Sequence, residues 1–229
     1  MPINMFECVI LAGGFGTRLK SVSKNIPKPM MPVGEQPFLY MLMKNLEKYG
    51  CSNIVLSLHY KSDYIKEKII QDNPVKCNVN FVIEPEPLGT GGAIKYACSK
   101  IDDERFIVLN GDTYQNLDYL DFYNSSSCSD LLISAVKIDN NCRYGSITID
   151  SNMNVISIDS GTSSNLINSG TYSLKRSDIK GFKEDVFSFE NDFLVNFQGN
   201  FKAYVNENIF IDIGVPEDYF RANELLKWK

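Results

Sequence analysis

The chain has 229 residues, of which 44% are hydrophobic and 22% charged, a composition typical of a globular domain with a full-sized core. Its net charge of −5 argues against nucleic acid as a partner, since nucleic-acid binding needs a clustered basic surface, but leaves a small polyanionic ligand open. Six scattered cysteines and one histidine lack the paired spacing of a zinc site and favour free thiols in a reducing, cytoplasmic compartment. We expect no signal peptide, and no membrane span, because no apolar run approaches ~18 residues.

The first predicted element is an apolar strand over 6–11, which leads into the loop Gly13-Gly14-Phe15-Gly16-Thr17-Arg18. Glycines let backbone N–H groups approach a ligand, and a row of such groups at a strand end forms an anion site. Arg18 adds a guanidinium suited to phosphate. The loop therefore predicts a phosphate-binding site, with a plain tight turn as the alternative. It is neither a dinucleotide fingerprint, because Leu19 follows where a third glycine is needed, nor a P-loop.

The next elements predict an α/β fold. The segment 26–34 contains Pro27-Lys28-Pro29, and we expect a stiff, extended loop that presents Lys28. Helices are predicted over 37–49 and 62–71, and they alternate with strands over 53–58 and 78–83. This alternation indicates a sheet with helices on both faces.

Two further strand ends carry polar or glycine-rich turns. After the strand 78–83, Pro85 and Pro87 stop the strand, and Thr90 is predicted to cap a helix that runs to about residue 100. A short strand over 105–109 ends in Asn110-Gly111-Asp112. Since ligands of open α/β sheets bind at the carboxyl ends of strands, Asp112 is a candidate metal ligand, with an Asx-type turn as the alternative.

The second half is predicted to contain a helix over 117–124 and a series of strands. These strands cover 130–137, 146–149, 155–158, 166–174 and 201–205, with a hairpin turn at 151–154 and a short helix after residue 189. A strand over 209–213 repeats the earlier pattern in Asp212-Ile213-Gly214, and Pro216 begins the final helix. Asp112 and Asp212 are a candidate pair for Mg²⁺, which binds to few carboxylates together with substrate phosphates and water.

Taken together, these motifs resemble those of nucleoside-triphosphate sugar-1-phosphate nucleotidyltransferases. The resemblance runs through Leu11-Ala12-Gly13-Gly14-Phe15-Gly16-Thr17-Arg18-Leu19, Pro27-Lys28-Pro29-Met30, Pro87-Leu88-Gly89-Thr90-Gly91-Gly92-Ala93, Gly111-Asp112 and Asp212-Ile213-Gly214. The sequence of residues 18–30 is most similar to that of the D-glycero-α-D-manno-heptose 1-phosphate guanylyltransferases. Enzymes that act on mannose or glucose 1-phosphate are close alternatives.

The resemblance implies one Rossmann-like α/β domain over 1–229, with a mostly parallel, mixed central sheet flanked by helices. The nucleotide-binding part would cover about 1–115 and the sugar-binding part about 116–229. The reaction implied joins GMP from GTP to a sugar 1-phosphate and releases pyrophosphate, with Mg²⁺ as cofactor and without a covalent enzyme intermediate. The partners are thus GTP and a sugar 1-phosphate, in a monomer or a homo-oligomer.

The resemblance also implies roles for individual residues. Arg18, Lys28 and Asp112 would serve catalysis, and Asp112 with Asp212 would hold Mg²⁺. The nucleotide would contact Leu11, Ala12, Gly13, Gly14, Gly16, Thr17, Arg18, Lys28, Glu84, Leu88, Gly89, Thr90 and Gly111. The sugar would contact Gly145, Asp159, Asn168 and Glu190.

Two positions bear on specificity. The Glu84 carboxylate is an acceptor that matches the adjacent N1–H and N2 amine of guanine, if it faces the base. After the strand 155–158 the family usually has Glu-Lys, with the lysine on the sugar phosphate, whereas this chain has Asp159-Ser160. Lys175 or Arg176 could supply the missing cation.

Two rival functions remain at this stage. A non-catalytic nucleotide-binding subunit is supported by the change at Ser160 but opposed by the presence of Arg18, Lys28 and both aspartates. A dinucleotide-dependent oxidoreductase is opposed by the missing third glycine.

Overall fold

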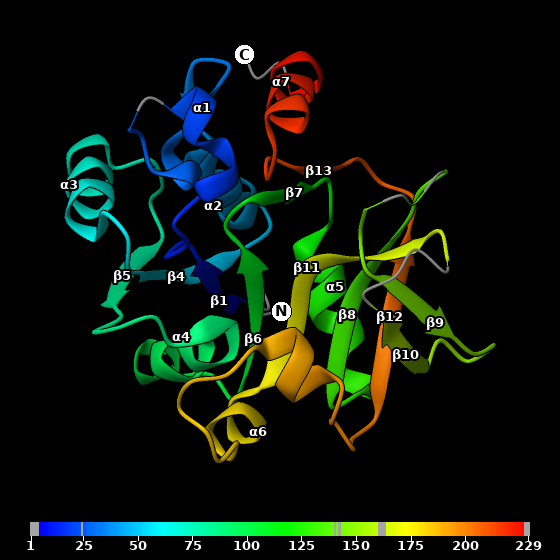
Figure 1. Ribbon diagram of the computed structural model, residues 1–229. Helices are drawn as coiled ribbons and strands as arrows, with labels where there is room; N and C mark the ends of the chain where they lie inside the picture. Colours follow the sequence, from blue (N-terminus) through cyan, green and yellow to red (C-terminus); the bar gives the residue numbers. More distant parts are fainter. Residues whose placement is uncertain (1–4, 24, 140, 142, 160–163, 227–229) are drawn as a thin grey trace.

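The computed structural model describes residues 5–23, 25–139, 141, 143–159 and 164–226 (Figure 1). Nine of the described strands form one main sheet, in which seven lie in the order β10-β9-β11-β6-β1-β4-β5 and β8 joins β11 to β12. Their bounds are β1 Phe6–Leu11, β4 Cys51–Leu58, β5 Asn78–Ile83, β6 Arg105–Asn110, β8 Leu131–Lys137, β9 Ser146–Ile149, β10 Val155–Asp159, β11 Leu166–Lys175 and β12 Phe201–Asn206.

The half of the sheet built from the first part of the chain is parallel. The central strand β1 pairs in parallel with β4 on one side and β6 on the other, and β4 pairs in parallel with β5. The register sets Leu11 beside both Ser57 and Asn110. The carboxyl ends of these strands therefore meet at one edge, as the sequence predicted.

The other half is largely antiparallel. The ten-residue strand β11 pairs antiparallel with β6, β8 and β9, and β9 forms an antiparallel hairpin with β10. Only β12 runs parallel to its neighbour, β8. The predicted mixed sheet flanked by helices is thus confirmed, with its parallel pairs gathered mainly in the first half of the chain.

Helices cover both faces of the sheet, in the arrangement visible in Figure 1. The helices α2 (Phe38–Lys48), α3 (Ser62–Asp72), α5 (Tyr119–Ser125) and α7 (Pro216–Leu225) share one core, and α4 (Gly89–Ala97) and α6 (Arg176–Lys180) share the other. Alternate residues of β1 supply both cores: Ile10 packs into the first and Val9 into the second. None of the described helices is long and apolar enough to cross a membrane.

The structure differs from the expected elements at two site segments. Residues Lys28–Met30 form one turn of 3-10 helix instead of a fully extended loop, since Pro29 sits in the first turn, where a missing N–H costs nothing. Thr90 lies inside α4, whose N-cap is Leu88, so the prediction that Thr90 caps the helix is wrong.

Several short elements were not predicted. They are α1 (Lys20–Ser23), β2 (Pro32–Val33), β3 (Gln36–Pro37), α6 and β7 (Thr113–Gln115). The strand β7 pairs antiparallel with β13 (Phe210–Asp212), outside the main sheet. Elements of two to five residues carry too little periodicity to be recognised in a sequence.

Candidate active site

A cavity of about 330 Å³ opens at the carboxyl edge of the parallel half. Its walls come from the ends of β1, β4, β5 and β6, the start of α4, and the Lys28 turn. The lining includes ten of the predicted residues: Leu11, Ala12, Gly13, Gly14, Lys28, Glu84, Gly89, Thr90, Gly111 and Asp112. Most of the motifs read from the sequence therefore converge on one cavity.

The glycines of this cavity serve two different purposes. A Cβ on Gly13 would lie 3.0 Å from Glu84 Oε1 and 3.1 Å from the backbone nitrogen of His59, and a Cβ on Gly111 would lie 2.5 Å from the Leu11 carbonyl oxygen. Packing against the Leu11 backbone thus requires a glycine at Gly111, whereas a Cβ on Gly13 would be tight and its neighbours would have to shift. A Cβ on Gly14 would meet no atom within 4 Å, so this glycine borders open space that a ligand can enter.

Four predicted nucleotide residues lie outside the lining. Gly16, at φ +59°, precedes the 3-10 turn Thr17–Leu19, and Arg18 is exposed on that turn. Leu88 is buried and donates its backbone N–H to Glu84 Oε2 at 3.3 Å. The structure thus does not bring the Arg18 side chain to the cavity wall.

Glu84 is a buried carboxylate held in place by neighbours. Its Oε1 accepts a hydrogen bond from Ser57 Oγ at 3.1 Å, and its Oε2 accepts the Leu88 N–H. The His59 ring lies beside it, with Nδ1 3.2 Å from the Glu84 carbonyl oxygen. Because a carboxylate has about four acceptor positions, Glu84 keeps acceptor capacity toward the cavity.

The two predicted metal ligands lie on either side of one ammonium group. Lys28 Nζ is 2.5 Å from Asp112 Oδ2 and 4.0 Å from Asp212 Oδ1. The short β7–β13 ladder brings the aspartates together, because Asp212 pairs with Thr113 and the N–H of Ile213 donates to the Asp112 carbonyl at 2.9 Å. From the sequence, these aspartates could be paired only because each follows an apolar strand and lies close to a glycine.

Opposing influences act on the pKa of Asp212 in this cluster. Burial, followed by the nearby charge of Asp112, raises the pKa of Asp212, while Lys28, the Gly214 N–H and Arg143 act in the opposite sense. The Gly214 N–H donates to Asp212 Oδ1 at 2.6 Å. Two cations, Lys28 and Arg143, therefore lie near Asp212 in this structure.

The donor set fits a hard divalent cation that is only partly held by protein. Among the residues that the structure describes, no three His, Cys, Asp or Glu side chains converge on one point. Two carboxylates are what Mg²⁺ commonly takes from a protein when substrate phosphates and water complete its shell. The Lys28 ammonium, which lies between the carboxylates, thus serves as a stand-in for the metal cation that they could hold.

The predicted sugar-side residues cluster on the antiparallel half, outside the cavity lining. A Cβ on Gly145 would lie 2.9 Å from the Asp159 carbonyl oxygen, and the Gly145 carbonyl accepts the Asn168 N–H at 3.4 Å. Asp159 is exposed and accepts a hydrogen bond from Ser157 at 3.1 Å. The structure thus brings Gly145, Asp159 and Asn168 together.

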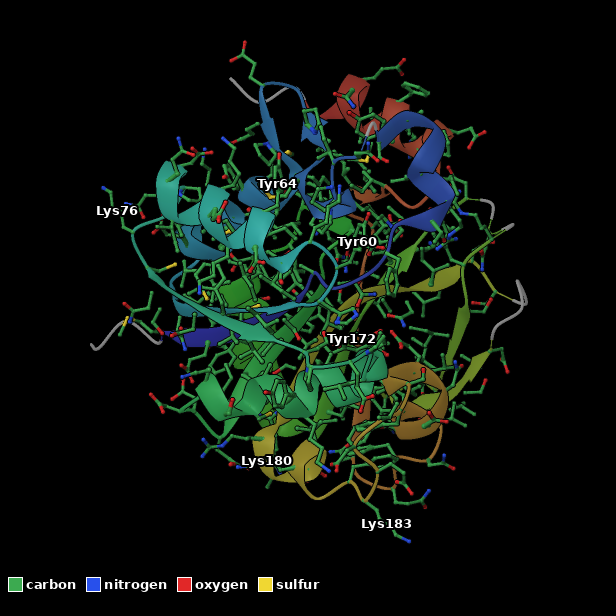
Figure 2. The ribbon with its side chains drawn as sticks, turned by 60° about the vertical axis from the view of Figure 1, so that its left-hand side comes forward. Tyr60, Tyr64, Lys76, Tyr172, Lys180 and Lys183 are labelled. Carbon is green, nitrogen blue, oxygen red and sulfur yellow. The ribbon has the colours of Figure 1, made fainter. Side chains whose placement is uncertain are left out.

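Glu190 joins this cluster to the nucleotide side. Its Oε2 accepts from Thr90 Oγ1 at 2.9 Å, and its Oε1 accepts from the buried Tyr172 hydroxyl at 3.2 Å. Asn168 Nδ2 donates to the same hydroxyl at 2.8 Å. Figure 2 shows Tyr172 beside the helix that carries Phe189, whose ring is 4.9 Å away.

The expected replacement for the missing sugar-side lysine is wrong. Lys175 binds to Asp130 at 2.5 Å, and Arg176 donates to the Ile101 carbonyl at 2.6 Å. Lys175 is the last residue of β11 and pairs with Arg105 at the start of β6, and Arg176 follows it, so both lie at the end of the sheet opposite the cavity edge. Ser160, the position of the departure, lies outside the described residues.

Sequence reasoning missed several residues at the site. His59 and Asn110 directly follow or end parallel strands and line the cavity, so the rule that ligands bind at carboxyl strand ends would have found them. Phe15, also in the lining, packs edge-on against His59 with ring centroids 5.7 Å apart. Arg143, whose Nη2 is 3.6 Å from Asp212 Oδ2, carried no local signal.

Comparisons with known proteins agree with this geometry. The model of the nucleotidyl transferase family matches residues 7–228. The chain is 38% identical over 220 residues to a D-glycero-alpha-D-manno-heptose 1-phosphate guanylyltransferase from Campylobacter jejuni subsp. jejuni, covering 93% of this chain and 97% of the relative. It is 36% identical over 228 residues to the enzyme of the same name from Aneurinibacillus thermoaerophilus, covering 96% and 98%.

A solved structure is also similar to this chain over almost its whole length. HddC from Yersinia pseudotuberculosis, in complex with GMP-PN, has a TM-score of 0.91 at 56% sequence identity and covers 97% of this chain and 100% of that chain. The chain therefore belongs to the nucleotidyl transferase family, whose members transfer a nucleotide to a sugar 1-phosphate and generally use a divalent metal.

Proposed function

We propose that the protein transfers GMP from GTP to D-glycero-α-D-manno-heptose 1-phosphate, which yields the GDP-sugar and pyrophosphate. The observation that carries the proposal is the cluster of Lys28, Asp112 and Asp212, of which Lys28 and Asp112 line a glycine-walled cavity. The names of two relatives that cover almost the whole chain, and a GMP-PN complex of a 56% identical protein, support guanine and heptose as the specific substrates.

In this proposal the chain divides by substrate. Residues up to about 115 bind to the nucleotide, and residues from about 116 bind to the sugar phosphate. Gly13 and Gly14 offer backbone N–H groups to the phosphates at the open side of the cavity. Glu84, which lines the same cavity, accepts hydrogen bonds from guanine N1–H and the N2 amine.

Asp112 and Asp212 would hold Mg²⁺, which when bound neutralises charge on the reacting phosphates. Lys28 then exchanges its contact with Asp112 for a phosphate oxygen, because one carboxylate cannot serve both cations equally. Arg18 is exposed on its turn and is free to bind to the leaving β,γ-phosphates. A sugar phosphate oxygen attacks the α-phosphorus in line, pyrophosphate leaves, and no bond to the enzyme forms.

The sugar side uses Gly145, Asp159, Asn168 and Glu190. Asn168 and Glu190 are oriented by the Tyr172 hydroxyl that they share. We also place the reaction in the cytoplasm, since every described cysteine is a free thiol and a reducing compartment keeps thiols free. All proposed contacts come from one chain, so the proposal holds for a monomer or a homo-oligomer.

The test is pyrophosphate release with Mg²⁺, in which four nucleoside triphosphates are crossed with the 1-phosphates of D-glycero-D-manno-heptose, mannose and glucose. We expect release with GTP and the heptose phosphate, and at least tenfold less with other pairs. Preferred use of mannose or glucose 1-phosphate would contradict the sugar assignment and keep the reaction. Binding of GTP without release from any pair would indicate a nucleotide-binding subunit.

A further inference from the structure

A second cation, Arg143, lies near the other carboxylate oxygen of Asp212 from the one that Lys28 approaches. Arg143 precedes β9, and its Nη2 lies 3.6 Å from Asp212 Oδ2. The same nitrogen forms an ion pair with Asp218, in the first turn of α7, and a hydrogen bond with the Tyr144 hydroxyl. The Arg143 side chain is 36% exposed and the Asp218 side chain 16%, so the pair is partly shielded from water.

The two oxygens of Asp212 thus face different partners. Oδ1 accepts the Gly214 N–H at 2.6 Å and faces Lys28 at 4.0 Å, whereas Oδ2 faces Arg143 at 3.6 Å. The terminal torsion of an aspartate is broad, so a single hydrogen bond leaves the carboxylate plane free to turn. Partners at both oxygens fix that plane.

The contact with Arg143 gains importance during the proposed reaction. When Lys28 moves to a phosphate, Arg143 stays beside Asp212. An arginine keeps its charge under all relevant conditions, and its planar fork is preorganised. Arg143 is itself anchored by Asp218 and by the Tyr144 ring, whose centroid is 4.7 Å from the guanidinium carbon.

We propose that Arg143 is a positioning residue, which holds the carboxylate of Asp212 in the orientation that binds the divalent metal. The inference rests on the proposed role of Asp212 as a metal ligand. Groups that orient metal ligands change metal affinity by about 10- to 100-fold when they are removed.

The test measures Mn²⁺ binding, followed by the electron paramagnetic resonance signal of the free ion, in the presence of GTP and without sugar phosphate, against a protein-free solution of the same GTP concentration, because GTP itself binds Mn²⁺. We expect Arg143→Gln to weaken Mn²⁺ binding by about tenfold, and Arg143→Lys to recover part of that loss. Asp218→Asn keeps the guanidinium but removes its anchor, so it should weaken binding in the same direction and by less. Lys175→Gln is the matched control, since Lys175 belongs to a remote ion pair with Asp130.

Steady-state kinetics then separate positioning from substrate contact. We expect kcat of Arg143→Gln to fall while the KM for the sugar phosphate stays within about twofold. Wild-type Mn²⁺ affinity in Arg143→Gln overturns the proposal, and a raised KM for the sugar phosphate with unchanged Mn²⁺ affinity shows that Arg143 binds to substrate instead. If Arg143→Gln fails to fold, Arg143→Lys and Asp218→Asn decide the question. A wild-type protein that turns over GTP but binds no Mn²⁺ refutes the metal assignment of Asp212 itself.

Discussion

The parallel and antiparallel halves of the sheet build their parts of the site in different ways. On the parallel side, contiguous motifs end at one edge and present backbone groups around a cavity. On the antiparallel side, single side chains from distant segments are joined by hydrogen bonds, such as those that link Thr90, Glu190, Tyr172 and Asn168. Backbone geometry can be read from local sequence, whereas a side-chain network depends on the tertiary fold.

The largest expected effect belongs to Lys28, which lies between the two proposed metal ligands. We expect Lys28→Gln to lower kcat by about 10³-fold, because it removes a preorganised charge on the reacting phosphates. In the absence of nucleotide the same variant should bind Mn²⁺ more tightly than the wild type, since the ammonium no longer competes at Asp112. Turnover and Mn²⁺ titration measure the two effects, and weaker Mn²⁺ binding would show that Lys28 is not a stand-in cation.

A pair of glycine variants tests whether backbone geometry defines the parallel side. A Cβ on Gly92 would lie 2.2 Å from the Asp185 carbonyl oxygen, so Gly92→Ala should lower the free energy of unfolding by about 1–3 kcal/mol. Gly14→Ala meets open space, and its stability should stay within about 0.5 kcal/mol of the wild type. Gly14→Ala should instead weaken GTP binding by about tenfold, because its Cβ enters the ligand space. Denaturant unfolding and GTP titration compare the two variants, and equal stability losses would contradict the distinction.

A substitution of Glu84 tests whether this side chain of the parallel half selects the base. Glu84→Gln should weaken use of GTP by about tenfold, since a hydrogen bond to a charged acceptor contributes about 1.5 kcal/mol or more. Use of UTP should change less, because an amide suits the uracil edge better than a carboxylate does. The measurement is kcat/KM for both nucleotides, and equal losses would indicate that Glu84 serves only Ser57 and Leu88.

The sugar side should respond to loss of one hydroxyl. Tyr172→Phe keeps the buried ring and removes the group shared by Asn168 and Glu190. We expect the KM for the sugar phosphate to rise about threefold, in line with a net ~1 kcal/mol for a hydrogen bond, while the Kd for GTP stays unchanged. A change confined to GTP binding would show that the network serves the Thr90 turn rather than the sugar.

The smallest effect concerns stability without metal. The folded-state pKa of Asp212 is raised, mainly by burial, so its ionised form costs stability above that pKa, and the cost disappears as the pH falls through it toward the ordinary range of aspartate. Asp212→Asn should therefore melt at a slightly higher temperature than the wild type at neutral pH, and the difference should shrink on acidification. Melting curves between about pH 4 and pH 7.5 without divalent metal test this. A lower melting temperature for the variant would mean that Lys28 and Arg143 more than offset the burial of Asp212.

Much of the fold could be predicted because its strong signals are local. The strands over 6–11, 78–83 and 146–149 were predicted with the bounds that the structure has, since apolar runs and turn residues mark them. The helix before Tyr49 and the final helix after Pro216 followed from apolar spacing and from proline at a helix start.

The remaining features depend on contacts between distant segments. The ladder of β7 with β13 covers only three residues on each strand and joins parts of the chain far apart in sequence. Lys175 lies at the end of β11 remote from the cavity because β11 runs antiparallel to β6 and β8. Hydrophobic periodicity does not indicate the direction of a strand, so the sequence could not place Lys175. The link between Arg143 and the site could be recognised only from the distance between its guanidinium and the Asp212 carboxylate.

The separation of Asp112 and Asp212 along the chain has a consequence for folding kinetics. Closing the β7–β13 ladder is a non-local step, and such steps are slow because loop-closure entropy must be overcome before the contact stabilises anything. The parallel strands and their glycine loops, in contrast, come from the first half of the chain. The two carboxylates therefore come together only after segments far apart in the chain have met, so their pairing depends on the completed fold.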